Sequence, residues 1–261
     1  MRTTHLFGLD FAVDTSIAEL AEGLVRDGQT KTAQWRVVVT PNVDHLVRYR
    51  KSLTQRHVAE NAHLVLPDGA PIVWVSRRLG SPIDQRLAGS DLFAEWWRRM
   101  VVAQRPLLLI AGNEALADYM TREHPGCGCI VPPRFDEDDA VAIAAVADGV
   151  LKELQSRPVD AVVVGLSMPK HHAIAAYLRA AQPPASGTPL LLLLGASAEF
   201  YAGQQRRAPK WVQRIGMEWL YRLLSHPRRL ARRYLIDDVA FFPIVWREWR
   251  AHRATLDNSA S

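Results

Sequence analysis

The chain has 261 residues, of which 48% are hydrophobic and 23% are charged, and 32 Lys and Arg against 27 Asp and Glu give a formal net charge of +5. These proportions are those of a soluble globular protein, and they exclude a disordered chain, a collagen and a disulfide scaffold. The length fits one large domain, or one domain with an appendage.

The first three quarters of the chain alternate short apolar runs with helical stretches. Strands are predicted over 6–11, 36–39, 64–66, 106–110, 161–164 and 190–194, and helices over 16–26, 44–60, 70–79, 91–103, 114–122, 138–155 and 170–181. Several strand runs are continuously apolar, as in strands that are covered on both faces. We therefore predict an α/β, Rossmann-like fold with a mostly parallel sheet flanked by helices.

The strand pattern stops after residue 203, and helices are predicted over 209–225 and, as one or two helices, over 227–253. This division predicts an α/β core over 1–203 and a helical appendage over 204–261. Residues 206–253 contain twelve basic and four acidic residues, a net charge of +8, so the remainder of the chain is net −3.

The basic segment also contains four of the eight tryptophans, which are Trp211, Trp219, Trp246 and Trp249. Arginine mixed with tryptophan fits an anionic membrane surface. A solvated helical face with its tryptophans in the core is the structural alternative. The charge alone would also fit nucleic acid, but no recognised reader motif accompanies it, so we expect no nucleic-acid partner.

The cysteines and the amino-terminal segment exclude further classes of protein. Cys127 and Cys129 are too closely spaced for a zinc knuckle, so we expect free thiols near a strand or turn and no metal site. The apolar run at the start is interrupted by Asp10, and no run is long enough to cross a membrane, so neither a secretory signal nor a membrane span is expected.

Ligands of open α/β sheets bind at the carboxyl ends of the strands. Thr40 and Asn42 follow the strand over 36–39, and Asp68 and Gly69 follow the strand over 64–66. The polar side chains can bind a ligand or simply cap the following helix. A carboxylate at position 68 could also act as a general base.

Two further junctions favour phosphate. Arg86 and Gly89 precede the helix predicted from Asp91, and Lys170 and His171 begin the helix over 170–181. Helix N-termini with nearby cations can bind an anion. No dinucleotide-binding glycine motif, phosphate-binding P-loop or hydrolase nucleophile elbow occurs, which disfavours those enzyme classes.

Taken in order, these junctions resemble the WecG/TagA/CpsF glycosyltransferase family, also called glycosyltransferase family 26. The resemblance rests on Thr40-Pro41-Asn42, Pro67-Asp68-Gly69, Arg86-Leu87-Ala88-Gly89-Ser90-Asp91-Leu92, Gly165-Leu166-Ser167-Met168-Pro169-Lys170, Phe200, Gly203, Arg207-Ala208-Pro209, Glu218-Trp219-Leu220-Tyr221-Arg222-Leu223, Pro227-Arg228-Arg229 and Arg233-Tyr234.

The resemblance implies an inverting glycosyltransferase that needs neither a metal nor another cofactor. It implies a UDP-sugar donor and a polyprenyl-diphosphate-linked acceptor, used for surface polysaccharides on the cytoplasmic face of a bacterial membrane. The appendage is implied to close over the active site and to bind the membrane surface. Oligomerisation is possible, and a non-catalytic, membrane-associated assembly partner is the alternative function.

Residue roles follow from the resemblance by position. Asp68 matches the catalytic base, Thr40 and Asn42 the adjacent pocket, and Arg86 an arginine near the donor or its leaving phosphate. Arg222, Arg229 and Arg232 would bind diphosphate from the appendage. The remaining candidates for substrate binding are Gly69, Gly89, Asp91, Lys170, His171 and Arg207.

Three residues depart from the family pattern. His171 and His172 replace a glutamine and an acid, and Tyr201 stands where many relatives carry an acid. Because histidine can still donate to a hydroxyl or phosphate, we expect a shifted sugar or acceptor preference.

Overall fold

The computed structural model describes residues 2–30, 32–182, 184, 186–214, 216–225, 227–232 and 237–259. The side chains of Lys210, Arg214, Arg222, Arg229 and residues 255–259 lie outside this description.

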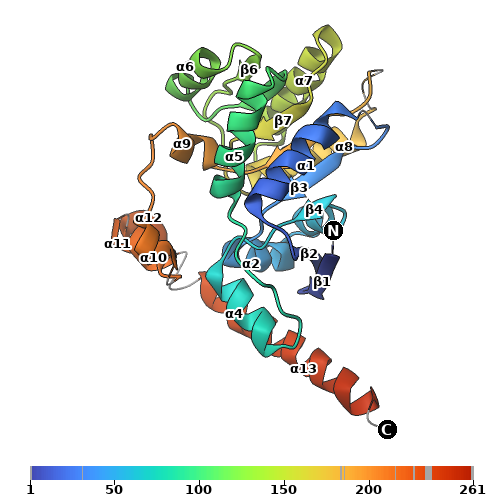
Figure 1. The fold of residues 1–261 in the computed structure, drawn as a ribbon, viewed down its shortest axis with the longest axis vertical. Helices are drawn as coiled ribbons and strands as arrows, with labels where there is room; N and C mark the ends of the chain where they lie inside the picture. The colour runs from blue at the N-terminus through green and yellow to red at the C-terminus, as the bar shows by residue number, and fades with distance from the viewer. Residues whose placement is uncertain are drawn as a thin grey trace.

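An eight-stranded sheet forms the centre of the described chain (Figure 1), in the spatial order β1-β2-β4-β3-β8-β7-β5-β6. Its strands are β1 (Arg2–Leu6), β2 (Leu9–Val13), β3 (Arg36–Val39), β4 (Leu64–Val65), β5 (Leu107–Ile110), β6 (Cys127–Ile130), β7 (Ala161–Val164) and β8 (Leu190–Leu193). Only the β1–β2 pair is antiparallel, and the other neighbouring strands described run parallel. The predicted α/β class with a mostly parallel sheet is confirmed.

Helices cover both faces of this sheet. One face packs against α1 (Ile17–Gln29), α5 (Gly89–Val102), α6 (Glu114–Glu123) and α9 (Ser197–Tyr201). The other packs against α2 (Val43–Lys51), α3 (Leu53–Glu60), α4 (Ala70–Arg78), α7 (Ala140–Ser156) and α8 (Lys170–Ala180). Within β8, Leu191 and Leu193 enter one core cluster while Leu190 and Leu192 enter the other, which explains the continuous apolar runs.

Several predicted elements have different bounds in the structure. The strand expected over 6–11 is a hairpin, because Phe7 and Gly8 turn the chain with φ of 57° and 77°. The helix expected over 44–60 divides at Ser52, whose hydroxyl accepts a bond from the Gln55 amide and begins α3. Strand β6 was not predicted. It contains both free thiols, whose sulfurs are 3.9 Å apart, so the expectation of free thiols is confirmed.

The chain after Gly203 forms α10 (Lys210–Arg214), α11 (Glu218–Ser225), α12 (Pro227–Arg232), the 3₁₀ helix η2 (Asp238–Ala240) and α13 (Phe241–Ser259). The single helix predicted over 209–225 is wrong, because the chain turns at Gly216 with a φ of 74°. The division into a core over 1–203 and an appendage over 204–261 stays a prediction.

Helix α13 returns to the core and packs beside the amino-terminal hairpin. The rings of Phe7 and Phe241 are 5.7 Å apart, and the Phe7 amide donates to Glu248 Oε1 at 3.0 Å. The far half of α13 projects away from the sheet (Figure 1). The first and last elements of the chain are therefore neighbours.

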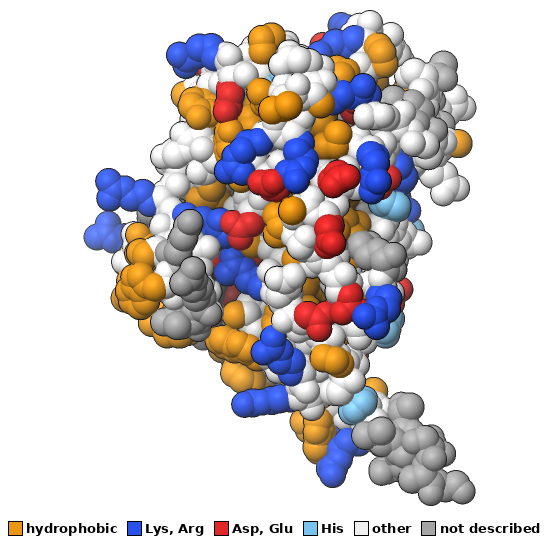
Figure 2. Space-filling model, viewed as in Figure 1, with side chains coloured by type: hydrophobic (Ala, Val, Ile, Leu, Met, Phe, Trp, Pro, Cys, Tyr) orange, Lys and Arg blue, Asp and Glu red, His pale blue; other side chains and the backbone are white. Residues whose placement is uncertain are grey.

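The surface carries apolar and basic side chains around the C-terminal helices (Figure 2). Trp211, Trp219, Trp246 and Trp249 are between 38% and 66% exposed, so the alternative that places these tryptophans in the core is wrong. Within the described ranges, no helix combines the length and apolarity needed to cross a membrane.

Candidate active site at the carboxyl ends of β3 and β4

The loops after β3 and β4 are held together by backbone hydrogen bonds. Strands β3 and β4 pair in parallel, so their carboxyl ends lie at the same edge of the sheet. The Asp68 amide donates to the Pro41 carbonyl at 3.0 Å, and the Leu87 amide donates to the Pro67 carbonyl at 3.0 Å. The junctions that contain Asn42, Asp68 and Arg86 are thereby brought side by side.

The Asp68 carboxylate is oriented by two groups of the third junction. Its Oδ2 accepts the Gly89 amide at 3.2 Å, and its Oδ1 is 3.6 Å from Nε of Arg86. The side chain of Asp68 remains 28% exposed. A carboxylate that is fixed in direction and open to a cavity can accept a proton from a bound hydroxyl.

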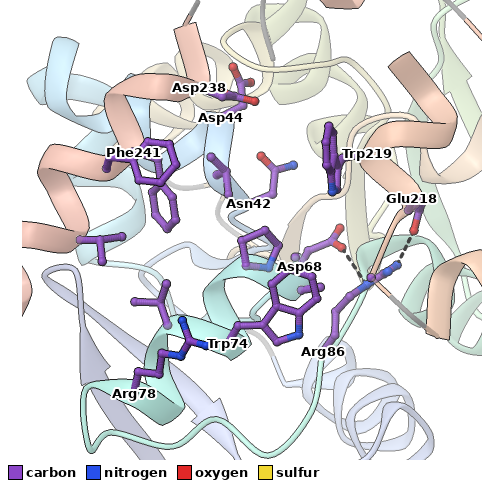
Figure 3. A pocket seen from close by; sticks show the side chains of 18 of the residues that line it. Asn42, Asp44, Asp68, Trp74, Arg78, Arg86, Glu218, Trp219, Asp238 and Phe241 are labelled. Carbon is purple, nitrogen blue, oxygen red and sulfur yellow. Dashed lines mark ion pairs between the residues drawn. The ribbon is translucent and has the colours of Figure 1, made fainter. Parts of the chain in front are cut away.

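Arg86 connects Asp68 to the C-terminal helices. Its Nη2 is 2.9 Å from Oε2 of Glu218, which is the first residue of α11, and the Glu218 side chain is only 14% exposed (Figure 3). The carboxylate of Glu218 also lies 4.0 Å from Nε of Arg207. A row of alternating acidic and basic side chains, Asp68, Arg86, Glu218 and Arg207, thus links the core to the chain beyond residue 203.

Arg207 completes this network through Asp91 in the first turn of α5. Its Nη1 and Nη2 donate to the two Asp91 oxygens at 2.5 and 3.0 Å. Burial alone would lower the pKa of Arg207, but the bonds to Asp91 and the charges of Asp91, Glu218 and Asp68 outweigh it and raise the pKa. Asp91 and Arg207 therefore bind each other in this structure.

A cavity of about 880 Å³ lies between α4, α11 and α13, and Figure 3 shows Phe241 across it from Arg86 and Glu218. Of the residues predicted from the sequence, it is lined by Asn42, Asp68, Gly69 and Arg86. The sequence reasoning did not assign the other lining residues to the site, among them Asp44, Trp74, Arg78, Glu218, Trp219, Phe241 and Trp246. Glu218 and Trp219 belong to a motif that carried the resemblance, whereas no sequence signal marks Trp74 or Arg78.

Gly216 allows α11 to approach α4 closely. A Cβ at this position would lie 2.5 Å from Cζ2 of Trp74 and 2.8 Å from Cβ of Ala70. Its positive φ is also a conformation that glycine adopts readily. The closure of the cavity on this side thus depends on the absence of a side chain.

Thr40, Asn42 and Gly89 pack around the base of the site. Asn42 caps α2, with its Oδ1 accepting the His45 amide at 3.3 Å, so the predicted capping role is confirmed. Thr40 is only 6% exposed, and a Cβ on Gly89 would lie 2.9 Å from its hydroxyl. Thr40 and Gly89 contact each other and do not line the cavity.

Lys170 and His171 are not in the cavity either. Lys170 Nζ donates to the Phe135 carbonyl at 2.5 Å and lies 4.2 Å from the centre of the Phe135 ring. His171 is 2% exposed, and its Nδ1 donates to the Leu166 carbonyl at 2.9 Å. Its ring centre is 5.8 Å from that of His45, whose Nδ1 accepts the Asn42 amide at 3.1 Å in the cap of α2.

Neither histidine adds a positive charge at the N-terminus of α8. Burial lowers the pKa of His171 to about 4, and burial together with His171 and His45 lowers the pKa of His172 well below its usual value. Both rings are therefore neutral at pH 7. With Nδ1 donating to Leu166, the Nε2 of His171 can accept a hydrogen bond but cannot donate one.

The other predicted residues are placed as follows. Arg232 is exposed at the end of α12. Arg222 lies in α11 and Arg229 in α12, but both side chains are outside the described part of the chain. Tyr201 donates to Glu123 Oε1 at 2.7 Å and packs on Phe93, away from the cavity.

A Rossmann-like sheet with an oriented carboxylate and an arginine facing a cavity at its strand ends defines an α/β enzyme that acts on a polar ligand. The chain matches the model of the glycosyl transferase WecG/TagA/CpsF family over residues 4–255. It belongs to this family and is a glycosyltransferase.

Two relatives carry the same name, N-acetylglucosaminyldiphosphoundecaprenol N-acetyl-beta-D-mannosaminyltransferase. The protein of Bacillus spizizenii is 27% identical over 245 residues, which are 89% of this chain and 87% of the relative. The protein of Bacillus subtilis strain 168 is 28% identical over 190 residues, which are 70% of this chain and 69% of the relative. Among the described residues of this chain, no group of three or more His, Cys, Asp or Glu side chains could hold a metal ion.

Proposed function

We propose that this protein transfers a sugar from a UDP-sugar to a polyprenyl-diphosphate-linked saccharide in the synthesis of a bacterial surface polysaccharide. The names of the two relatives describe transfer of N-acetyl-β-D-mannosamine to an undecaprenyl-diphosphate-linked N-acetylglucosamine. The observation that carries the proposal for this chain is the Asp68 carboxylate, oriented by Gly89 and Arg86 at the edge of the cavity.

In the proposed reaction, Asp68 removes the proton from the acceptor hydroxyl as its oxygen attacks the anomeric carbon of the donor sugar. The new glycosidic bond forms while the bond from the sugar to UDP breaks, so one displacement inverts the configuration. A single base is sufficient for this step.

The negative charge that develops on the leaving UDP must be stabilised by positively charged groups. We assign Arg86 to the leaving phosphates, with Arg222, Arg229 and Arg232 contributing from the C-terminal helices. Guanidinium groups bind phosphate oxygens in pairs, and cations placed where charge develops lower the barrier without a metal ion. Thr40 and Asn42 hold the base of the pocket, and Asp91 and Arg207 hold the C-terminal helices to the core.

We place the protein at the cytoplasmic face of the plasma membrane, attached peripherally through residues 204–261. The support is the net charge of +8 over 206–253 together with the exposed tryptophans of this segment. Basic side chains attract anionic lipids, and tryptophan rings prefer the headgroup level.

A UDP-release assay tests the function. The purified protein is incubated with a panel of UDP-sugars and a short-chain polyprenyl-diphosphate sugar, with EDTA present. We expect release from one donor that depends on the acceptor and is unchanged by EDTA. If folded protein releases UDP from none of the donors, the result would instead favour the non-catalytic assembly partner. Release of UDP that EDTA abolishes would contradict metal independence.

A further inference from the structure

The cavity extends from Asp68 along the whole of α4. Asp68 precedes the amino end of α4, and Arg78 is its last residue. Nine helical residues span about 13 Å. The opposite wall of this extension is α13, so the cavity continues as a groove between two helices, with Asp68, Arg86 and Glu218 on one side and Arg78 on the other (Figure 3).

Large apolar side chains line the extension although water reaches them. Phe242 is 73% exposed, Trp246 55%, Trp74 47% and Trp249 40%. Exposed apolar side chains scattered over a surface are ordinary, but a contiguous group around one hollow marks a binding site. We call this hollow the aromatic groove, formed by Trp74 and Arg78 of α4 and by Phe242, Val245, Trp246 and Trp249 of α13.

The groove wall of α13 borders the face that anchors the helix, since Phe241 lines the cavity and also joins the core, and Val245 packs against the core. Phe242, Val245, Trp246 and Trp249 recur at intervals of three and four, which is one stripe of a helix. Phe241 and Ile244 are each 8% exposed and join the protein core instead. Packing α13 on the core therefore leaves this aromatic stripe without a covering element in the described structure.

At the end away from Asp68, Arg78 lines the groove, and Arg250 and Arg253 stack on tryptophans that line it. Arg78 closes α4, the guanidinium of Arg250 lies 4.8 Å above the Trp246 ring, and that of Arg253 lies 4.7 Å above the Trp249 ring. Paired arginine and tryptophan side chains fit the level of anionic headgroups at a membrane. Among the described residues that line the cavity, the acidic ones are Asp44, Asp68, Glu218 and Asp238, and none of them belongs to the aromatic groove.

We propose that the aromatic groove binds the first isoprenoid units of the acceptor, next to its diphosphate, so that the enzyme recognises the lipid as well as the sugar. This proposal rests on the proposed function. The groove is polar at the reacting end, apolar along its length and cationic at its mouth. A saccharide joined by diphosphate to an isoprenoid chain that leads into a membrane has the same order of chemistry.

Calorimetric titration tests the groove without requiring turnover. Farnesyl diphosphate, with three isoprene units, is compared with isopentenyl diphosphate, with one, on the full-length protein and on Phe242→Ser and Trp246→Ser. Both positions are more than half exposed, so the fold should tolerate serine. Trp211→Ser is the matched control, because Trp211 is a 66% exposed tryptophan of the basic segment that does not line the groove.

We expect farnesyl diphosphate to bind at least about tenfold more tightly than isopentenyl diphosphate, with most of this difference lost in both groove variants and kept in Trp211→Ser. Equal affinity for the two diphosphates in the unmodified protein would overturn the proposal. So would a chain-length preference that both groove variants retain, or one that Trp211→Ser loses equally, because the preference would then arise outside the groove.

Turnover with acceptors of different chain lengths separates this proposal from the proposed function. Chain-dependent binding without sugar transfer would leave the groove standing and remove the transferase assignment. Sugar transfer at the same KM for short and long acceptors, in the unmodified protein and in Trp246→Ser, would support the transferase assignment and overturn the proposal for the groove.

Discussion

The two carboxylate oxygens of Asp68 have different partners. Oδ2 accepts the Gly89 amide at 3.2 Å, while Oδ1 lies on the side of Arg86. The hydrogen bond from the Gly89 amide fixes the rotation of the carboxylate, and the guanidinium of Arg86 lies beside its other oxygen. An oriented carboxylate can remove a proton from a sugar hydroxyl.

Asp68→Asn should lower turnover at least about a hundredfold, because asparagine can still accept the Gly89 amide but cannot take up a proton. Steady-state UDP release measures the effect, and the melting temperature should stay close to that of the unmodified protein. Asp118→Asn, on the exposed face of α6, is the control and should leave turnover unchanged. Near-normal turnover of Asp68→Asn would remove the assigned base.

Among the elements, α11 reaches the site through a close approach to α4 at Gly216. Gly216→Ala should reduce UDP release at least about tenfold, because the added Cβ meets Trp74 and Ala70 and moves Glu218 away from Arg86. Gly203→Ala is the matched control, since Gly203 also has a positive φ, of 72°, but has no neighbouring atom within 4 Å of an added Cβ. Equal losses in both variants would attribute the effect to backbone conformation alone.

Helix α12 presents basic side chains to solvent. The double variant Arg228→Ala and Arg232→Ala should sediment less with anionic phosphatidylglycerol vesicles, because each arginine near such a surface contributes about 1 kcal/mol. Both side chains are exposed, so the fold should be unaffected. A chain without residues 206–261 should lose the association altogether. Unchanged sedimentation of either protein would contradict attachment through this segment.

The helices and strands show where sequence reasoning works. Strands β3, β5, β7 and β8 were predicted closely because, apart from Arg36 at the start of β3, every residue is apolar, as two covered faces require. Strand β6 was missed because Cys-Gly-Cys carries little strand preference, and its partner β5 decides its conformation. The break at Ser52 was missed because a hydroxyl that caps a helix looks the same in sequence as one on a helix surface.

Some residues of the candidate site could likewise be predicted from the sequence, and others could not. Asn42 and Asp68 could be predicted because each follows a strand end, where the fold itself brings polar groups together. Arg86 could be predicted because it precedes the N-terminus of a helix. Trp74 and Arg78 could not, since they line the cavity only because α13 returns to lie opposite α4. His171 was misplaced because polar composition at a helix N-terminus does not reveal whether the side chain is buried.

At the scale of the whole molecule, the buried histidines link stability to pH. Tyr49, His45, His171 and His172 join α2 to α8, and Nε2 of His172 is 3.0 Å from the Tyr49 hydroxyl. Burial lowers the pKa of His171 from 6.5 to about 4, so the unfolded chain binds more protons than the folded chain between these values. The free energy of unfolding must therefore fall as the pH drops through this window.

Urea unfolding at pH 7 and pH 5 should show a loss of about 2 kcal/mol attributable to His171, as a shift from 6.5 to about 4 implies. His171→Gln removes the titrating group and should show a weaker pH dependence, while His5→Gln, exposed on β1, should behave like the unmodified protein. The same pH dependence in His171→Gln would show that other groups cause it.

The contact between Phe7 and α13 has a consequence for how the protein is made. During synthesis Phe7 leaves the ribosome 241 residues before Glu248, its hydrogen-bond partner. At about 5–20 residues per second, this interval is on the order of ten seconds or more. The sheet can assemble in that time, whereas the wall opposite α4 cannot. A nascent chain therefore has the Asp68 carboxylate in place before it has the aromatic groove, and the part of the enzyme for which we propose lipid binding is completed last.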